Sequence, residues 1–325
     1  MLFIPHKYLY ISGASYVSAD EPDYKEVITD ANSRRRMGRL LKMAVWCGLK
    51  SLDGVPSERV SGIITSTGAG FMKDTISFGS SIFDREETLL NPSPFMQSTF
   101  NTASGYIALI RKIHAYNTTY VQQADGFAAS LVDAAMLLDD AGEGNVALVG
   151  AFDEVTPEVD VIRKRLGLYR VGDGFLPLGE GAAAFLLSAA MPTDVSESCR
   201  ATEMSAGLGG GDGSESSSEP LHEYGGTSSS SLNCTKDGNA ALRFCGLANL
   251  SNLPKCAENP ISELFGINAG VNVISCADHV ESLGAFRSML PVLLCKLISE
   301  QKIPDGYTAI VDDVNEDGVI ILLHK

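Results

Sequence analysis

The stretch that decides the fold is TTYVQQADGFAASLVDAAMLL, Thr118 to Leu138. Its β-branched and aromatic start, short turn and Ala- and Leu-rich continuation predict a strand, a tight turn and a helix that ends near Leu138. In many α/β enzymes a nucleophile lies at such a turn, because the positive N-terminal end of the helix stabilises negative charge there. The turn offers the residues from Gln122 to Gly126 and contains no Cys, and the first Ser is Ser130.

The composition is typical of a globular protein. The 325 residues, 45% of them hydrophobic and 20% charged, suffice for two modest domains or one large pseudo-repeat. The net charge of −15 argues against general nucleic-acid binding, which needs a basic surface. No apolar run approaches the roughly 18 residues that span a membrane, and the N-terminus lacks the pattern of a signal peptide. Seven scattered cysteines without a C-x-x-C pair predict reduced thiols and a cytoplasmic protein.

Strands and helices alternate along the first part of the chain. Strands are predicted at 8–17, 60–70, 118–123, 145–155 and 179–190. Helices are predicted at 33–52, with Asn32 or Ser33 as the cap, from Asn101 or Thr102 onward, and after the turn of the opening stretch. The polar stretch 72–96 is interpreted as loop-rich. Continuous apolar strands that alternate with helices predict a mostly parallel sheet covered on both faces.

The composition changes after residue 190. The stretch AGLGGGDGSESSSEPLHEYGGTSSSSLN, 206–233, is rich in Gly and Ser and predicts a loop or linker over 191–239. Beyond it, NAALRFCGLANL at 239–250 is interpreted as a helix, VNVISCA as a strand and LGAFRSMLPVLLCKLISEQ as an apolar helix. YTAIVDDV and GVIILLHK, joined by NEDG, predict a hairpin. We therefore expect a first half at 1–190 and a shorter second half at 240–325.

The order of motifs resembles a known family. SPFMQSTFNTASGYIAL, the opening stretch, VALVGAFDEVTPE and GEGAAAFLL resemble the N-terminal half of β-ketoacyl-ACP synthases, and SCADHVESLGAFRSMLPVLLCKL resembles their "GH-x-x-GAAG" segment with the following helix. The resemblance implies the thiolase fold, an α/β five-layer αβαβα sandwich of two related halves, here with the second half shortened, and no cofactor. It is nearest to short, divergent synthase-like proteins and to the chain-length-factor subunits that pair with true ketosynthases.

The resemblance places Gln123 where the family has its catalytic Cys, because the C-x-x-G turn matches Gln123-Ala124-Asp125-Gly126. A Gln amide cannot form a thioester, so covalent acyl transfer is not expected. A one-residue slip would place Ala124 there, with the same consequence. Asp125 is interpreted as a helix cap, and Asp125, Gly126 and Phe127 are expected to border the substrate pocket. Chain-length-factor subunits also carry Gln at the Cys position.

The resemblance leaves few candidates for the two catalytic histidines. His279 is either a displaced catalytic His or a loop residue, and aligning "LGA" with the family's "GA" puts Glu281 at the His position. Glu281 would be a poor N–H donor to a thioester carbonyl. The family's "HGT-T" loop and its terminal Gly-rich loop have no counterpart. The carboxylates of DEVTPEVD, 153–160, are interpreted as a solvated turn, and no metal site is predicted.

Partners are implied by the same resemblance. The densest basic cluster, Arg34, Arg35, Arg36, Arg39 and Lys42, is a hypothetical contact for an acidic acyl carrier protein or a subunit. We expect a dimer through the region around 101–123, with a ketosynthase-like paralogue or a second copy. The leading hypothesis is a non-condensing partner that influences chain length in fatty-acid, polyketide or polyene biosynthesis. The alternatives are residual malonyl-ACP decarboxylase or acyltransferase activity, and an acyl-binding module without a partner enzyme.

Overall fold

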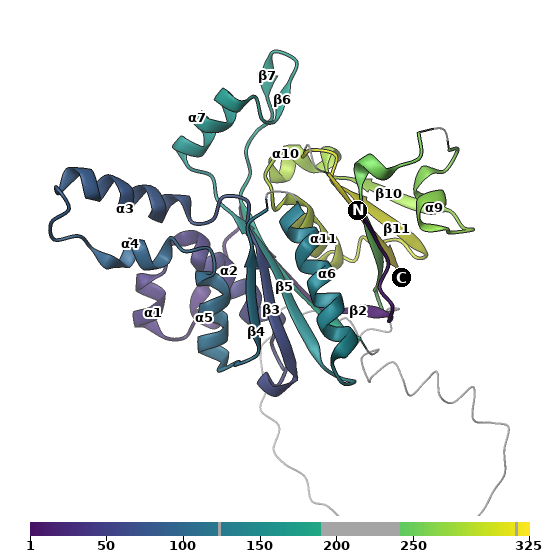
Figure 1. Cartoon of the computed structure of the whole chain (residues 1–325), viewed down its shortest axis with the longest axis horizontal. Helices are drawn as coiled ribbons and strands as arrows, with labels where there is room; N and C mark the ends of the chain where they lie inside the picture. The colour runs from purple at the N-terminus through teal and green to yellow at the C-terminus, as the bar shows by residue number, and fades with distance from the viewer. Residues whose placement is uncertain (123–124, 190–240, 256, 316–317) are drawn as a thin grey trace, which may run out of the picture.

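Two sheets joined edge to edge form the framework of the protein. The computed structural model describes residues 1–325 except 123–124, 190–240, 256 and 316–317 (Figure 1). The first sheet has the order β4-β3-β5-β8-β2. Its strands are β2 (Leu9–Val17), β3 (Val60–Ser66), β4 (Tyr116–Tyr120), β5 (Val146–Asp153) and β8 (Gly181–Ser188).

The first sheet is mixed, so the prediction of a mostly parallel sheet was wrong. β3 pairs in parallel with β4 and β5, whereas β8 is antiparallel to both β5 and β2. Every residue of β8 is buried, although the strand is antiparallel. Its continuous apolar run therefore results from helices on both faces of the sheet and carries no information on strand direction.

The second sheet continues from β2 in the order β9-β12-β11-β10. Its strands are β9 (Arg243–Asn249), β10 (Val271–Ser275), β11 (Tyr307–Val311) and β12 (Val319–His324), and β1 (Leu2–Phe3) pairs with β9. The antiparallel pairing of β11 and β12 confirms the predicted hairpin. The predicted helix at 239–250 is wrong, because β9 occupies its centre. The spacing of apolar residues in that run fits a helix as well as a strand. It forms a strand because it pairs with β12 and β1.

Helices complete five layers around these sheets. α2 (Arg39–Ser51) and α5 (Thr102–Arg111) pack on the outer face of the first sheet. α6 (Asp125–Asp140) and α11 (Met289–Ser299) lie between the two sheets, as Figure 1 shows, and form the largest core. α9 (Pro260–Phe265) covers the outer face of the second sheet. This is the predicted αβαβα sandwich with a shortened second half.

Two stretches of the first half differ from the prediction. The single helix predicted at 33–52 is two helices, α1 (Ala31–Arg36), capped by Asp30, and α2. They separate because Met37 is extended and the Gly38 N–H donates to Gln97 Oε1 at 2.8 Å. The stretch predicted to be loop-rich contains α3 (Met72–Asp84) and α4 (Pro92–Gln97), which project from the body of the molecule (Figure 1).

The remaining elements are short. They are α7 (Pro157–Leu166), α10 (Val280–Leu283), the hairpin of β6 (Arg170–Val171) and β7 (Gly174–Phe175), and 3-10 turns at Tyr24–Glu26, Ser57–Arg59, Leu250–Asn252 and Ala277–His279. None of the helices that the structure describes is long and apolar enough to cross a bilayer. The predicted linker at 191–239 lies outside the described residues, and the division into 1–190 and 240–325 stays a prediction.

The main chains of the two halves contact each other in the segments that precede β8 and α11 in the sequence. The Ala285 N–H donates to the Pro177 carbonyl at 2.7 Å, and the Gly179 N–H donates to the Ala285 carbonyl at 3.3 Å. A Cβ on Gly179 would lie 1.8 Å from the Leu283 carbonyl oxygen, so no side chain fits there. Gly284 has φ +75, and a Cβ on it would lie 2.3 Å from the Gly179 nitrogen. The "GEG" and "LGA" motifs are thus the two sides of one contact.

Candidate functional site

The carboxyl ends of the first sheet's parallel strands gather at one edge, beside the junction with the second half. β3 ends at Ser66, β4 at Tyr120 and β5 at Asp153, and parallel pairing brings these ends together. α6 begins at Asp125, directly after β4. Ser288, which precedes α11, donates its hydroxyl to Asp153 at 2.6 Å. In open α/β sheets this edge is where ligands bind.

Asp153 is the polar centre of this edge. Its Oδ1 accepts from the Gly68 and Ala69 N–H groups at 2.9 and 3.0 Å and from the Thr67 hydroxyl at 3.0 Å, while Oδ2 accepts from Ser288. Complete burial raises the pKa of Asp153, and these four donors oppose that rise only in part. The interpretation of 153–160 as a solvated turn was therefore wrong for Asp153, because this carboxylate ties the loop after β3 to the start of α11.

An apolar crevice of about 240 Å³, which we call the seam crevice, opens beside Asp153 and beneath α7. Its apolar lining includes Met72, Val159, Ile162, Leu168, Leu178 and Phe286. Tyr169 also lines it and donates its hydroxyl to Asn315 Oδ1 at 2.8 Å, and Arg287 lies over the Tyr169 ring at 5.9 Å. Burial raises the pKa of Tyr169, so the phenol stays neutral.

The hydrogen bonding that starts at Tyr169 continues through Asn315 to Asp312. Asn315 donates its side-chain amide to Asp312 at 2.7 Å, and Asp312 accepts the Asn315 N–H at 3.2 Å. Burial raises the pKa of Asp312 as well. Sequence reasoning missed Asp153, Tyr169, Arg287 and Asp312. The only available signal was an acidic residue at the carboxyl end of two apolar strands, Asp153 after β5 and Asp312 after β11.

The start of α6 positions the residues predicted from the opening stretch. Gln123 lies outside the described residues. Asp125 is half-buried, accepts from the Asn249 side-chain amide at 3.4 Å and borders a groove of about 600 Å³. Gly126 is buried close to Ser66, where a Cβ would meet that side chain at 3.4 Å. Phe127 packs in the core, its ring 5.6 Å from that of Phe185.

His279 and Glu281 lie after β10 on the second half. His279 ends the 3-10 turn Ala277–His279 and is half-buried, and Glu281 is exposed on α10. Neither side chain lines the seam crevice or the groove at Asp125. Their catalytic roles stay predictions.

The predicted basic cluster is divided between two helices. Arg34, Arg35 and Arg36 lie on α1, while Arg39 and Lys42 lie on α2. Arg39 is already paired with Glu21 and Glu180, which lowers the pKa of Glu21 despite the opposing effect of its burial. Arg35 and Arg36 are exposed. A partner-binding role, which stays a prediction, would thus rest on the α1 arginines more than on Arg39.

Comparison with known proteins agrees with this architecture. The model of the N-terminal domain of β-ketoacyl synthases matches residues 14–168. The ishigamide ketosynthase/chain length factor has 14% identity and a TM-score of 0.62, over 98% of this chain and 99% of that chain. The structure titled AntDE:AntF, a type II PKS acyl-carrier protein in complex with its ketosynthase, has the same identity, coverage and TM-score. A β-ketoacyl synthase from Burkholderia phymatum STM815 has 11% identity and a TM-score of 0.60, over 98% of both chains.

No curated protein matches the chain by sequence. At these identities the solved structures establish the fold, which is the thiolase fold. The chain thus has the thiolase fold, and its residues 14–168 are similar to the N-terminal domain of β-ketoacyl synthases.

Proposed function

We propose that this protein is a non-condensing, chain-length-factor-like partner of a β-ketoacyl-ACP synthase in fatty-acid, polyketide or polyene-type biosynthesis. The proposal rests on Gln123, which the motif match aligns with the family's Cys, two residues before the start of α6 in the sequence. A carboxamide cannot hold an acyl group as a thioester. The described cysteines, Cys47, Cys245, Cys276 and Cys295, lie on other elements and are buried or half-buried.

The seam crevice supports a role in binding an acyl chain. Its walls are mostly apolar, and both carboxylates of its lining accept hydrogen bonds: Asp153 at both oxygens, and Glu154 from the Lys73 N–H at 2.8 Å. A non-polar chain can therefore enter without leaving a charged group unpaired. Arg287 at its border supplies a cation for the phosphate of a carrier-bound pantetheine arm.

The exposed side of the first sheet supports assembly with a paralogue. β4 is the last strand of the sheet in the described chain, so one of its edges is free. Large apolar side chains on the adjacent helices are exposed, among them Phe83 (84%), Phe95 (55%) and Leu109 (74%). A free edge beside exposed apolar groups favours association, either with a ketosynthase-like paralogue or with a second copy.

The test is reconstitution with the ketosynthase paralogue and acyl carrier protein of the same organism. Incubated alone with an acyl carrier protein thioester, the full chain should show no acyl adduct by intact-mass spectrometry. Added to the paralogue, it should form a complex and change the chain length of the product. A stable acyl adduct, or a product distribution that ignores the added chain, would contradict the proposal.

The second candidate is decarboxylation of malonyl-ACP without an acyl-enzyme. The N-terminus of the 16-residue helix α6 favours it, because free N–H groups there can stabilise an enolate. Asp125 opposes it, since its carboxylate lies at the same helix end. Release of acetyl-ACP that Gln123→Ala abolishes and Gln122→Ala leaves intact would establish this activity.

A further inference from the structure

Residues 157–176 form the outer wall of the seam crevice, and we call this segment the cover. It contains α7 and the β6–β7 hairpin, which project beyond the ends of the sheets in Figure 1. Val159 and Leu168 line the crevice from the cover, and Met72 and Phe286 line it from the body of the molecule. The crevice is thus the space between the cover and the body, so its size depends on where the cover lies.

The two ends of the cover are fixed at neighbouring points. Asp153, which precedes the cover, is buried and accepts hydrogen bonds from four donors. Gly179, which follows the cover, is buried and donates its N–H to the Ala285 carbonyl at 3.3 Å. Asp153 also pairs with Gly181 where β5 and β8 lie side by side. The cover therefore leaves the fold and re-enters it at one place, as a hinged lid does.

The cover is braced within itself. Arg163 donates to Asp160 at 2.7 Å and to the Leu176 carbonyl at 3.1 Å. Its guanidinium also lies 5.3 Å from the centre of the Phe175 ring. The Leu176 N–H donates to the Tyr169 carbonyl at 2.9 Å. These contacts join α7 to the β6–β7 hairpin, so the cover can move as one unit.

The cover is attached to the body by few contacts. Arg163 is its only buried residue, and Leu166 is 68% exposed. Tyr169 and Leu176 pack in part against the main core. Among the described residues, one side-chain hydrogen bond joins the cover to the second half, from the Tyr169 hydroxyl to Asn315 Oδ1 at 2.8 Å. Segments with so few buried contacts open at a small cost in free energy.

The closed crevice is small and leaves apolar surface in contact with water. Its volume of about 240 Å³ is below the range of about 300–1,000 Å³ that is usual for ligand pockets. Ile162 lines the crevice and is nevertheless 48% exposed. A chain bound there would need the cover to move outward, and it would in return bury apolar surface that the closed cover leaves exposed.

We propose that the cover is a lid on the seam crevice, hinged at Asp153 and Gly179 and held shut by the hydrogen bond between Tyr169 and Asn315. Opening breaks this bond and admits an unbranched apolar chain. Closure over the chain restores the bond and keeps water away from the chain. The choice of an apolar chain as the ligand rests on the proposed function, whereas the lid itself does not.

The lid is tested on the full chain with a thiol introduced into the crevice by Met72→Cys. Its rate of alkylation by iodoacetamide is followed by peptide mass spectrometry, which separates it from the native cysteines. We expect slower alkylation than for Ser93→Cys at an exposed position of α4, and a roughly two- to tenfold faster rate when Tyr169→Phe removes the bond that holds the lid. Tyr116→Phe is the matched control. It removes a hydroxyl that donates to Asp133 at 2.9 Å, outside the cover, and should leave the rate unchanged.

Three results of the alkylation experiment would overturn the lid. If the Met72→Cys thiol reacts as fast as the Ser93→Cys thiol, the crevice is already open. If Tyr169→Phe leaves the rate unchanged, the Tyr169 hydroxyl does not hold the cover. If Tyr169→Phe makes the buried Cys47 more reactive by the same factor, the variant unfolds as a whole instead of opening a lid.

The ligand is tested with cis-parinaric acid, an unbranched polyene acid whose fluorescence rises in an apolar site. Stopped-flow fluorescence should show saturable binding to the full chain, and the bound probe should slow alkylation of the Met72→Cys thiol. Tyr169→Phe should raise the association and dissociation rate constants alike, by roughly two- to tenfold, because the same opening step precedes both. Loss of a wall contact alone would raise only the dissociation rate constant.

The lid and the proposed function fail in different ways. If the alkylation rates follow the expectation but the probe does not bind, the lid stands and the acyl-binding role of the seam crevice is wrong. If the probe binds but Tyr169→Phe changes only its dissociation, the binding role stands and the lid is wrong.

Discussion

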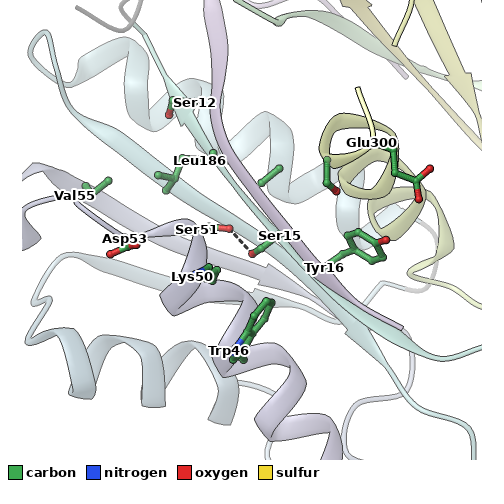
Figure 2. Close-up of a pocket in the computed structure, with 13 residues that line it drawn as sticks. Ser12, Ser15, Tyr16, Trp46, Lys50, Ser51, Asp53, Val55, Leu186 and Glu300 are labelled. Atoms are coloured by element: carbon green, nitrogen blue, oxygen red, sulfur yellow. Dashed lines mark hydrogen bonds between the residues drawn. The ribbon is translucent and has the colours of Figure 1, made fainter. Parts of the chain in front are cut away.

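The seam between the halves and a hollow of about 360 Å³ along β2, the edge hollow (Figure 2), both contain polar groups, but they differ in how far the described residues satisfy those groups. At the seam, Asp153 has four donors, and Tyr169 is bonded to Asn315. In the edge hollow, Ser12 and Trp46 have none in the described chain. A satisfied buried network fixes one geometry, whereas an unsatisfied one is costly until another group completes it.

This difference in hydrogen bonding between the seam and the edge hollow indicates different roles for the two regions, which their residue types alone do not reveal. The seam holds the two halves in register and leaves its apolar crevice as the place for cargo. In the edge hollow, the Ser12 hydroxyl and the Trp46 indole N–H form no hydrogen bond with the residues that the structure describes. Substitutions at the seam should therefore weaken folding more than the loss of the Ser12 hydroxyl does.

The largest expected effect is at the backbone contact of the seam. Gly179→Ala places a Cβ 1.8 Å from the Leu283 carbonyl oxygen, so the halves must separate locally. We expect a loss of more than about 4 kcal/mol in the free energy of unfolding, or no folded protein, measured by urea denaturation. The matched change Gly79→Ala in α3 meets no atom within 4 Å and should stabilise the helix by about 0.5–1 kcal/mol. Equal effects of the two would refute the close contact.

Removal of the Asp153 carboxylate is expected to have the next largest effect. Asp153→Ala leaves two main-chain N–H groups and two hydroxyls buried without an acceptor. The free energy of unfolding should fall by about 3–5 kcal/mol in denaturant titrations. Asp305→Ala removes an 89% exposed carboxylate and should change it by less than about 0.5 kcal/mol. A loss below 1 kcal/mol at Asp153 would mean that the network is dispensable.

The same carboxylate predicts a pH dependence. Burial raises the pKa of Asp153, so the folded chain keeps a proton that the unfolded chain releases as the pH rises above about 4. Its contribution to stability is therefore greatest below that pH and declines as the pH rises toward the folded-state pKa. Asp153→Asn should flatten the decline, and the part that remains should come from Asp312, Glu154 and Asp74, whose pKa values burial also raises. The measurement is the free energy of unfolding from pH 4 to 7 for the unchanged protein and for Asp153→Asn. If this free energy depends on pH equally in both, Asp153 does not cause the pH dependence.

The smallest expected effect has the opposite sign. Ser12→Ala removes a buried hydroxyl that has no partner in the described chain, so the free energy of unfolding should stay the same or rise by up to about 1 kcal/mol. Ser288→Ala, which removes a hydroxyl bonded to Asp153, should lower it by about 1 kcal/mol. If Ser12→Ala is the more damaging of the two, the hydroxyl has a partner and the contrast with the seam is lost.

The sequence predicted those elements whose local signals agree with their surroundings. The strand and the helix of the opening stretch are confirmed as β4 and α6, and the terminal hairpin as β11 and β12. Gly179 and Gly284 appeared in recognisable motifs, but only the fold shows that they touch. α3 was missed because Ser, Gly and Asp interrupt its apolar pattern, and 239–250 was misread because its apolar spacing fits two periods.

By itself the sequence determined the strand and the helix of the opening stretch, the terminal hairpin, the resemblance to β-ketoacyl synthases and the absence of Cys from the residues just before α6. These are local properties, set by residue type and spacing along the chain. Only the tertiary structure decided that Asp153 is a buried junction and that Arg39 is already paired. Such properties depend on which distant segments surround a residue, and burial and partnership, rather than residue type, determine what a polar group can do.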